Sequence, residues 1–306
     1  MAASDPQERA FAGVEELEAA LDAAGYLADE GLATAVFLAL ELRRPLFLEG
    51  EAGVGKTEVA KALSTVTGGE LLRLQCYEGI GLAQAAYEWD YARQLLHLRA
   101  TEATGGSARQ AEDELYSERF LVRRPLLLAL EERSGPVPVL LVDEVDRADD
   151  EFEAFLLEIL SEWAVSIPEL GTIRAARPPV VVLTSNRTRD VHDALKRRCL
   201  YHWVDHPAFE REVEILRRRA PGVGEALARQ VAAAAGRLRR LGLYKPPGVA
   251  EAIDWAGAVV ALGRSELDPK TATVTLGAVL KYQEDQERAR AAGLETLIDA
   301  AVEGGG

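Results

Sequence analysis

The chain has 306 residues, of which 48% are hydrophobic and 28% are charged, and its formal net charge is −15. This composition supports one large folded domain, or a large and a small one, and argues against disorder. The acidic excess disfavours a protein that lives on a nucleic-acid backbone. No apolar stretch is long enough to span a membrane, and residues 1–10 lack the features of a signal peptide.

Apolar periodicity predicts helices and strands that alternate over the first two thirds of the chain. Helices are expected at 14–42 (with a break near Gly25), 56–68, 78–100, 125–132 and 149–165. Strands are expected at 45–50, 71–76, 136–144 and 178–186, and a loop at 101–110. This alternation predicts an α/β fold in which a parallel sheet carries helices on both faces. After about Val204 the strand signals end, which predicts a small all-helical domain and a flexible tail at 301–306.

The two cysteines, Cys76 and Cys199, lie far apart in the sequence. This usage is typical of free thiols and predicts a protein of the reducing cytoplasm. Cys199 and His202 have Cys-x-x-His spacing, but no second pair lies nearby, so we expect no zinc site. Cys76 is expected to be a small buried side chain rather than a nucleophile.

The segment Gly50–Thr57, GEAGVGKT, matches the pattern G-x-x-x-x-G-K-[ST] between an expected strand and an expected helix. In this context glycines let backbone N–H groups fold around phosphates, and the helix N-terminus favours an anion. Lys56 would reach the β- and γ-phosphates of ATP, and the Thr57 hydroxyl would bind Mg²⁺. The alternative is a glycine turn with an incidental lysine. The predicted ATP-binding residues are Gly50, Glu51, Ala52, Gly53, Val54, Gly55, Lys56, Thr57 and Glu58.

The segment Val139–Asp146, VLLVDEVD, is an apolar strand that ends in adjacent carboxylates. Asp143 is expected to hold Mg²⁺, and Glu144 is expected to activate the attacking water as a general base. The alternative is an acidic surface turn, but four apolar residues directly before the pair argue against it. A glutamate at this point favours hydrolysis over transfer to a small acceptor.

Two further stretches extend this pattern. The strand VVVLTSN ends at Asn186, whose amide can orient the water, although Ser-Asn also makes an ordinary turn. Downstream, Arg197 and Arg198 lie together, and a guanidinium from a neighbouring subunit can stabilise a transferring phosphoryl group. The alternative for the arginine pair is a solvated basic turn.

These pieces, in this order, resemble the AAA+ ATPases. Within this superfamily the chain resembles the MoxR family, in the segments RPLFLEGEAGVGKTEVAKAL and LLVDEVDRADDEFEAFLLEILSEWAVSIPELGT. Two other segments, YEGIG…QAAYEW and KPPGVAEAIDWA, resemble its CoxD-like branch. The resemblance implies a three-layer αβα nucleotide-binding domain at 1–205 and a helical lid domain at 206–300. It also implies an insert in the second helix, about 78–92, and a hairpin at about 162–176.

The resemblance further implies a homo-oligomeric ring, usually of six subunits, that binds ATP between neighbours. It implies a chaperone-like role in maturing a client metalloenzyme of the molybdenum hydroxylase type, with a von Willebrand factor A domain protein as partner. Such relatives commonly offer a lid arginine to the nucleotide. The matching stretch, Leu243–Ala256, has no arginine, and Lys245, expected just before a helix that starts at a double proline, is the candidate substitute.

Other residues keep two interpretations each. Tyr87, Trp89 and Tyr91, on the insert, could contact a client or fill the core beneath the insert. Arg147 could reach a neighbouring subunit or pair with Asp149 or Asp150.

The leading function is an ATP-hydrolysing remodeller, and the runner-up is a DNA-directed AAA+ motor or loader. A small-molecule phosphotransferase and a non-hydrolytic scaffold are less well supported, because Glu144, Asn186 and the arginine pair suit water attack.

Overall fold

The protein is described by a computed structural model over residues 10–103, 114–293 and 298. Contacts between residues divide the chain into two compact units. The sheet unit comprises the described residues of Met1–Glu49 and Thr57–Trp203. The helical unit comprises Gly50–Lys56 and the described residues of Val204–Gly306. Residues 50–56 of the segment predicted to bind phosphate therefore group with the C-terminal helices, whereas Thr57 and Glu58 belong to the sheet unit.

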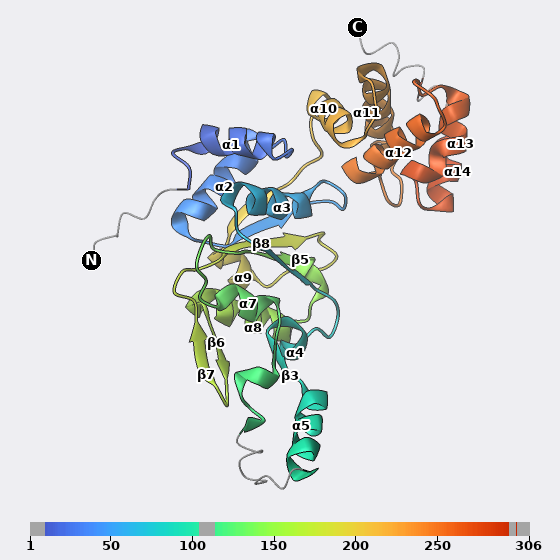
Figure 1. Cartoon of the computed structure of the whole chain (residues 1–306). Coiled ribbons are helices and arrows are strands. Elements are labelled where there is room, and N and C mark those ends of the chain that lie inside the picture. Colours follow the sequence, from blue (N-terminus) through green and yellow to red (C-terminus); the bar gives the residue numbers. More distant parts are fainter. Residues whose placement is uncertain (1–9, 104–113, 294–297, 299–306) are drawn as a thin grey trace. The chain divides into compact units, whose positions relative to one another are not determined.

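The sheet unit is built on a five-stranded sheet in the order β2-β5-β8-β1-β9 (Figure 1). All neighbouring strands in it run parallel. The strands are β1 (Leu46–Glu49), β2 (Leu71–Gln75), β5 (Val139–Asp143), β8 (Val180–Ser185) and β9 (Leu200–Trp203). Because parallel strands end at the same edge, the residues after β5 and β8 meet there.

Burial along the strands follows their places in the sheet. Every residue of β1 and β5 is buried, as expected for continuous apolar strands covered on both faces. The edge strand β2 instead alternates, with Leu72 and Leu74 buried and Arg73 and Gln75 exposed. The other edge strand, β9, was not predicted. It has only four residues, all at least partly exposed, and its sequence LYHW shows no clear alternation of apolar and polar residues.

Helices cover both faces of the sheet: α1, α2 and α3 on one, α7 and α8 on the other (Figure 1). Their bounds are α1 (Val14–Ala23), α2 (Glu30–Leu42), α3 (Lys56–Thr67), α7 (Pro125–Leu130) and α8 (Asp150–Glu162), with α9 (Asp193–Arg198) before β9. Aspartates cap two of them: Asp29 accepts a hydrogen bond from Leu32 N, and Asp149 accepts one from Phe152 N. The expected α/β core, followed by helices, is confirmed.

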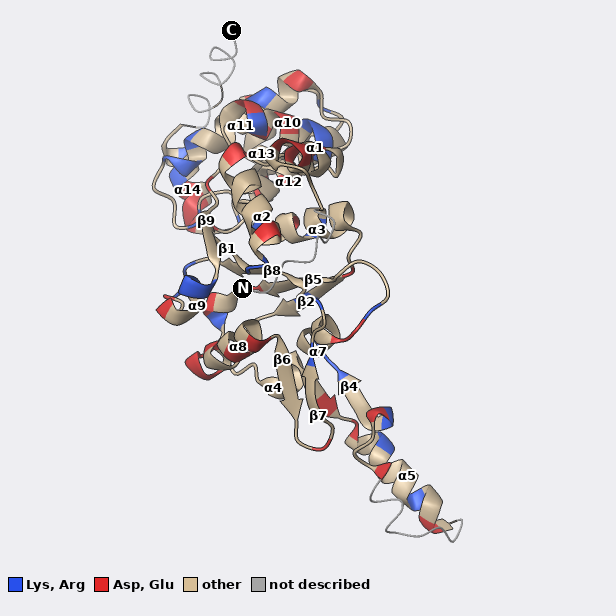
Figure 2. Cartoon of the chain, turned by 90° about the vertical axis from the view of Figure 1, so that its left-hand side faces the viewer, with Lys and Arg blue, Asp and Glu red and all other residues tan. Residues whose placement is uncertain are grey.

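The predicted helical pattern at 78–100 is wrong in its middle. The chain forms α4 (Leu82–Ala85), β3 (Tyr87–Trp89) and α5 (Tyr91–Ala103), followed by the 3₁₀ turn η1 (Glu118–Phe120) and β4 (Leu121–Arg123). Residues 87–89 are a strand because they pair antiparallel with β4 and bury Trp89. Helix α5 projects away from the five-stranded sheet and carries charges of both signs (Figure 2).

The helix predicted at 149–165 ends three residues early, at Glu162. Trp163 adopts a left-handed conformation with φ 48°, which terminates α8. Directly after Trp163 the chain forms an antiparallel hairpin of β6 (Ala164–Ile167) and β7 (Gly171–Arg174). On the other side of α8, the short 3₁₀ turn η2 (Val145–Arg147) links β5 to this helix.

The helical unit contains α10 (Phe209–Arg219), α11 (Glu225–Arg239), α12 (Val249–Ala261), α13 (Pro269–Val279) and α14 (Gln283–Ala291). Their apolar faces form one core around the fully buried Trp255. The double proline does not start α12 as expected, since the helix begins at Val249 with Gly248 as N-cap. Both prolines belong instead to the connection before it.

Two expectations fall partly or wholly outside the described residues: the loop at 101–110, of which 101–103 end α5, and the tail at 301–306. Among the helices that the structure describes, none combines the length and apolar composition needed to cross a bilayer.

Candidate functional site

The phosphate loop, residues 50–56, connects β1 to α3 and contains two glycines with positive φ, Gly53 (79°) and Gly55 (98°). Such values are costly for residues with a Cβ. The Lys56 ammonium is buried and donates to the carbonyls of Gly50 at 2.8 Å and Glu51 at 2.6 Å. The lysine side chain thus folds back onto its own loop.

The remaining predicted loop residues have ordinary surroundings. Glu51 pairs with His206 of the helical unit at 3.1 Å, whereas Ala52 is exposed and Val54 is buried. Glu58, in the first turn of α3, pairs with Lys61.

Within the helical unit, Gly248 rather than Lys245 lies against the phosphate loop. A Cβ on Gly248 would lie 2.7 Å from Gly53 Cα and 2.9 Å from Ala52 O, so only glycine fits. Beside it, Val249 N donates to Gly53 O at 2.9 Å. Lys245 is exposed, and its backbone N–H donates to Asp285. The role of Lys245 stays a prediction, but the contact with the loop is made by main chain three residues further on.

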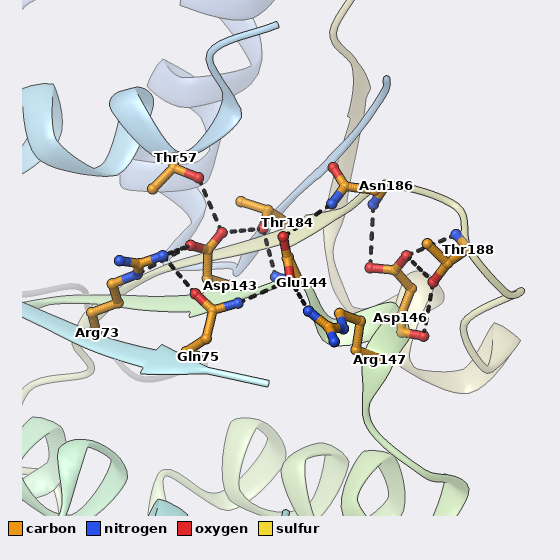
Figure 3. A network of polar contacts seen from close by, with 10 residues as sticks. All are labelled: Thr57, Arg73, Gln75, Asp143, Glu144, Asp146, Arg147, Thr184, Asn186 and Thr188. Atoms are coloured by element: carbon orange, nitrogen blue, oxygen red, sulfur yellow. Dashed lines mark hydrogen bonds and ion pairs between the residues drawn. The ribbon is translucent and has the colours of Figure 1, made fainter. Parts of the chain in front are cut away.

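The strand-end network lies at the carboxyl edge of the sheet unit (Figure 3). Its members are Thr57, Arg73, Gln75, Asp143, Glu144, Asp146, Arg147, Thr184, Asn186 and Thr188. The structure thus brings together Thr57, Asp143, Glu144 and Asn186, which the sequence analysis assigned to one reaction.

Asp143 is the buried centre of this network. Its Oδ1 accepts hydrogen bonds from Thr184 Oγ1 at 2.6 Å and from Thr57 Oγ1 at 3.1 Å. Its Oδ2 accepts two from Arg73, at 2.6 Å from Nη2 and 3.1 Å from Nε. Both oxygens of the carboxylate are therefore oriented by neighbouring elements.

Glu144 follows with a left-handed backbone, φ 55° and ψ 52°, which is uncommon for a residue with a side chain and occurs often at functional sites. Its backbone N–H donates to Thr184 Oγ1 at 2.9 Å. Asn186 Nδ2 donates to Glu144 Oε1 at 3.3 Å. The opposite oxygen, Oε2, accepts from Gln75 Nε2 and Arg147 Nη1, each at 3.1 Å. The carboxylate predicted to be the base is therefore held on both sides.

Asp146, which is 1% exposed, fixes the loop that carries Asn186. It accepts hydrogen bonds from Asn186 N at 3.2 Å and from Thr188 N at 2.8 Å, and Thr188 Oγ1 adds one at 2.7 Å. A buried carboxylate needs such donors, and the three bonds set the path of the backbone after β8.

Sequence reasoning missed Arg73, Gln75 and Thr184. The first two stand on the exposed side of β2, whose register places Gln75 opposite Asp143. A signal was present in the alternating polar residues of LLRLQC, but it becomes useful only when β2 is known to neighbour β5. Thr184 lies inside an apolar run and offers no sequence signal of its own.

Arg197 and Arg198 lie in the last turn of α9 and are exposed. Arg197 pairs with Asp193 at 2.7 Å, and the backbone carbonyls of both accept hydrogen bonds from the Arg44 side chain. Neither is a member of the strand-end network, and the role of either arginine in a neighbouring subunit stays a prediction.

The aromatic residues of the insert, for which two roles were considered, differ in exposure. Trp89 is buried, at 7% exposure, whereas Tyr91 is exposed at 66%, so the aromatic cluster is not one surface. Arg147 pairs with Glu144 rather than with the expected Asp149 or Asp150; Asp149 caps α8, and Asp150 pairs with Arg189.

Burial, and to a smaller extent the negative charges of Asp143, Asp146 and Glu144, raise the pKa of the Cys76 thiol to about 12. Burial likewise raises the pKa of Cys199 to about 12. Neutral, buried thiols fit the expected packing role. Over the described residues, no group of three or more His, Cys, Asp or Glu side chains is arranged to hold a metal ion.

The donor set at Asp143 and Thr57 fits magnesium. Mg²⁺ prefers oxygen ligands, and in nucleotide sites it is bound by one or two protein groups together with substrate phosphates. A carboxylate and a hydroxyl 3.1 Å apart meet that requirement.

Comparison with known proteins gives a family match. The family model AAA domain (dynein-related subfamily) matches residues 45–199. No curated protein matches the chain. Similar solved structures include the RuvB Holliday junction branch migration motor of Thermotoga maritima, 15% identical, with a TM-score of 0.46 over 90% of this chain and 72% of that one.

A RuvB variant of the same organism is 15% identical, with a TM-score of 0.48 over 90% of this chain and 73% of that one. A candidate ATPase from Cytophaga hutchinsonii is 16% identical, with a TM-score of 0.39 over 85% of this chain and 84% of that one.

Proposed function

The chain belongs to the AAA domain family, in its dynein-related subfamily, and is by family a AAA+ ATPase; from this premise we propose that it hydrolyses Mg·ATP to remodel a client protein. The observation that carries the hydrolytic part is the contact between Asn186 Nδ2 and Glu144 Oε1, at 3.3 Å, beside the Thr57–Asp143 pair. A polar amide and a carboxylate at one point can orient a water molecule and accept its proton.

The phosphate loop supplies binding. Its glycines at positive φ turn main-chain N–H groups toward an anion, and Lys56 adds a full positive charge. In binding ATP, the lysine would exchange the carbonyls of Gly50 and Glu51 for phosphate oxygens. Glu51, Ala52, Val54 and Glu58 would contribute backbone or helix-terminus groups rather than side-chain chemistry.

In the hydrolytic step, the oxygen of a water molecule attacks the γ-phosphorus of ATP. The bond between the γ-phosphorus and the oxygen that bridges it to the β-phosphorus breaks, and ADP and phosphate leave. Glu144 takes the proton of the water, and Asn186 holds that water in place. Gln75 and Arg147 occupy Glu144 Oε2, so the water would donate to Oε1, the oxygen that Asn186 contacts. Magnesium held at Thr57 and Asp143 would neutralise phosphate charge.

The proposed oligomer, partner and client rest on the sequence segments that resemble the MoxR family and its CoxD-like branch. We propose a homo-oligomeric ring, of six subunits in this family, in which Arg197 or Arg198 stabilises the transferred phosphoryl group of a neighbouring subunit. Lys245 is proposed to take the place of the lid arginine. The ring would act in the cytoplasm with a von Willebrand factor A domain protein, and its client would be a metalloenzyme of the molybdenum hydroxylase type.

Mixed subunits test the shared site. Chains carrying Arg197→Ala and Arg198→Ala together, or Glu144→Gln alone, should hydrolyse little ATP. Mixed in equal amounts they should regain activity, because some interfaces then combine an intact glutamate with an intact arginine pair. Full ATPase activity of the double arginine variant as a dilute monomer would refute the shared site.

The partner assignment is tested separately. Glu144→Gln protein with ATP should form a complex with a purified von Willebrand factor A domain protein from the same organism, and the complex should be absent with ADP. If instead DNA stimulates the ATPase, and the stimulation falls steeply with salt, the runner-up DNA motor is the better assignment.

A further inference from the structure

Arg73 is held on Asp143 by two hydrogen bonds to a single carboxylate oxygen. Its Nη2 and Nε lie 2.6 and 3.1 Å from Asp143 Oδ2. The two side chains come from neighbouring strands, β2 and β5, whose register fixes their approach. The aspartate side chain is only 5% exposed, whereas that of the arginine is 53% exposed. A buried carboxylate thus receives its charge partner from the solvent side of the sheet edge.

The same carboxylate is the one that fits magnesium. Its other oxygen, Oδ1, already faces the Thr57 hydroxyl at 3.1 Å. A divalent ion near this pair and a guanidinium on Oδ2 would both neutralise one negative charge, and the two cations would repel each other at short range. Burial makes a charge partner necessary for Asp143, so one of the two should be present in each state.

We propose that Arg73 is the internal counter-cation of Asp143 in the metal-free chain, and that Mg²⁺ binds only in competition with it. This inference rests on the proposed ATPase function, since it concerns the same site. Arg73 is then a positioning residue that sets how much Mg²⁺ the chain needs to bind ATP.

A second contact extends the effect of this arginine. Arg73 Nη2 also donates to Gln75 Oε1 at 2.5 Å, which fixes the orientation of the amide. The Gln75 nitrogen then faces Glu144 Oε2, at 3.1 Å. If Arg73 moves away from Asp143, Gln75 Oε1 loses the donor that holds it, and the Gln75 amide is free to rotate.

The test measures metal dependence of binding rather than turnover. A fluorescent, non-hydrolysable ATP analogue is titrated with the full chain at increasing Mg²⁺, and Mn²⁺ binding is followed independently by electron paramagnetic resonance. In Arg73→Gln, the Mg²⁺ concentration that gives half of the affinity gain should fall about tenfold, which corresponds to ~1.4 kcal/mol. Arg73→Lys keeps the charge and should stay within about threefold of the wild type.

Arg147→Gln is the matched control. The Arg147 side chain is 56% exposed, similar to the 53% of Arg73, but it contacts Glu144 rather than Asp143. Its replacement should change the Mg²⁺ requirement by less than about twofold. An equal fall in Arg147→Gln and Arg73→Gln would mean a general field effect and would overturn the competition.

Two further results would also overturn it. One is an unchanged or higher Mg²⁺ requirement in Arg73→Gln with a wild-type unfolding temperature. The other is a loss of nucleotide affinity that is equal with and without Mg²⁺, which would make Arg73 a phosphate ligand. If Arg73→Gln does not fold, a Mg²⁺ requirement for Arg73→Lys that departs more than threefold decides against the proposal. Failure of the wild-type chain to bind the analogue at any Mg²⁺ would instead refute the proposed function itself.

Discussion

The phosphate loop and the strand-end network hold their charged groups by different means. In the loop, main-chain atoms predominate: Lys56 donates to two carbonyls, and Gly248 meets Gly53 with no side chain between them. In the network, side chains from α3 and from neighbouring strands converge on Asp143 and Glu144. A main-chain site requires particular residue types at fixed spacing, whereas a side-chain site requires a particular strand register. The loop should therefore govern binding, and the network should govern what happens to the bound nucleotide.

The largest expected effect on nucleotide binding comes from removing the Lys56 ammonium from the loop. Lys56→Ala should weaken ATP binding at least about 100-fold, equivalent to ~2.7 kcal/mol, because charge-assisted contacts to phosphate are lost. Titration calorimetry with a non-hydrolysable analogue measures it. Lys61→Ala is the control, since this lysine is exposed and pairs with Glu58 on the surface of α3. Equal losses in the two variants would remove the distinction between loop and network.

The main-chain contact of the loop is tested by adding one carbon. Gly248→Ala should lower the free energy of unfolding by about 1–3 kcal/mol, because the new Cβ would meet Gly53 Cα at 2.7 Å. Gly257→Ala, in the same helix α12, has open space and should raise it by about 0.5–1 kcal/mol. Urea unfolding gives both values. A Gly248→Ala chain as stable as the wild type would show that the backbone approach is not required.

A single hydroxyl tests the network. Thr184→Val should lower the free energy of unfolding by about 1–2 kcal/mol, because Asp143 loses a donor and the backbone N–H of Glu144 loses its acceptor. Thr172→Val, on the exposed hairpin strand β7, should stay within about 0.5 kcal/mol. Denaturant melts of both variants, in parallel, decide whether the buried hydroxyl matters more than the exposed one.

The smallest effect is the pH dependence that the thiol beneath the network confers. The pKa of Cys76 is raised from 9.0 to about 12 in the folded chain, so its stabilising contribution is complete below pH 9 and is lost as pH rises toward 12. At pH 10 that loss is ~1.4 kcal/mol. The fall in unfolding free energy between pH 8 and pH 10 should therefore be smaller by about that amount in Cys76→Ala. A fall of unchanged size would place the thiol in water.

Much of the binding half of this account was available from the sequence. The spacing from Gly50 to Thr57 predicts the loop, and the apolar runs before Asp143 and Asn186 predict two strands of the sheet. Their meeting at one edge follows from the parallel arrangement that the alternation of helices and strands indicates.

The remainder depends on tertiary structure. Strand β9 is too short and too mixed to give a signal, and residues 87–89 become a strand only because β4 lies beside them. The contact of Arg73 with Asp143 requires β2 to neighbour β5, and the contact of Gly248 with Gly53 joins positions far apart in the chain. Neither pairing can be read from local pattern.

The central claim is that Glu144 acts in hydrolysis and not in binding, and Glu144→Gln tests it most directly. Nucleotide affinity is measured by calorimetry, and single-turnover hydrolysis is followed after rapid mixing with Mg·ATP. The account predicts affinity within about threefold of the wild type and a rate lower by about 10²–10⁴. Hydrolysis at the wild-type rate, with affinity unchanged, would contradict it.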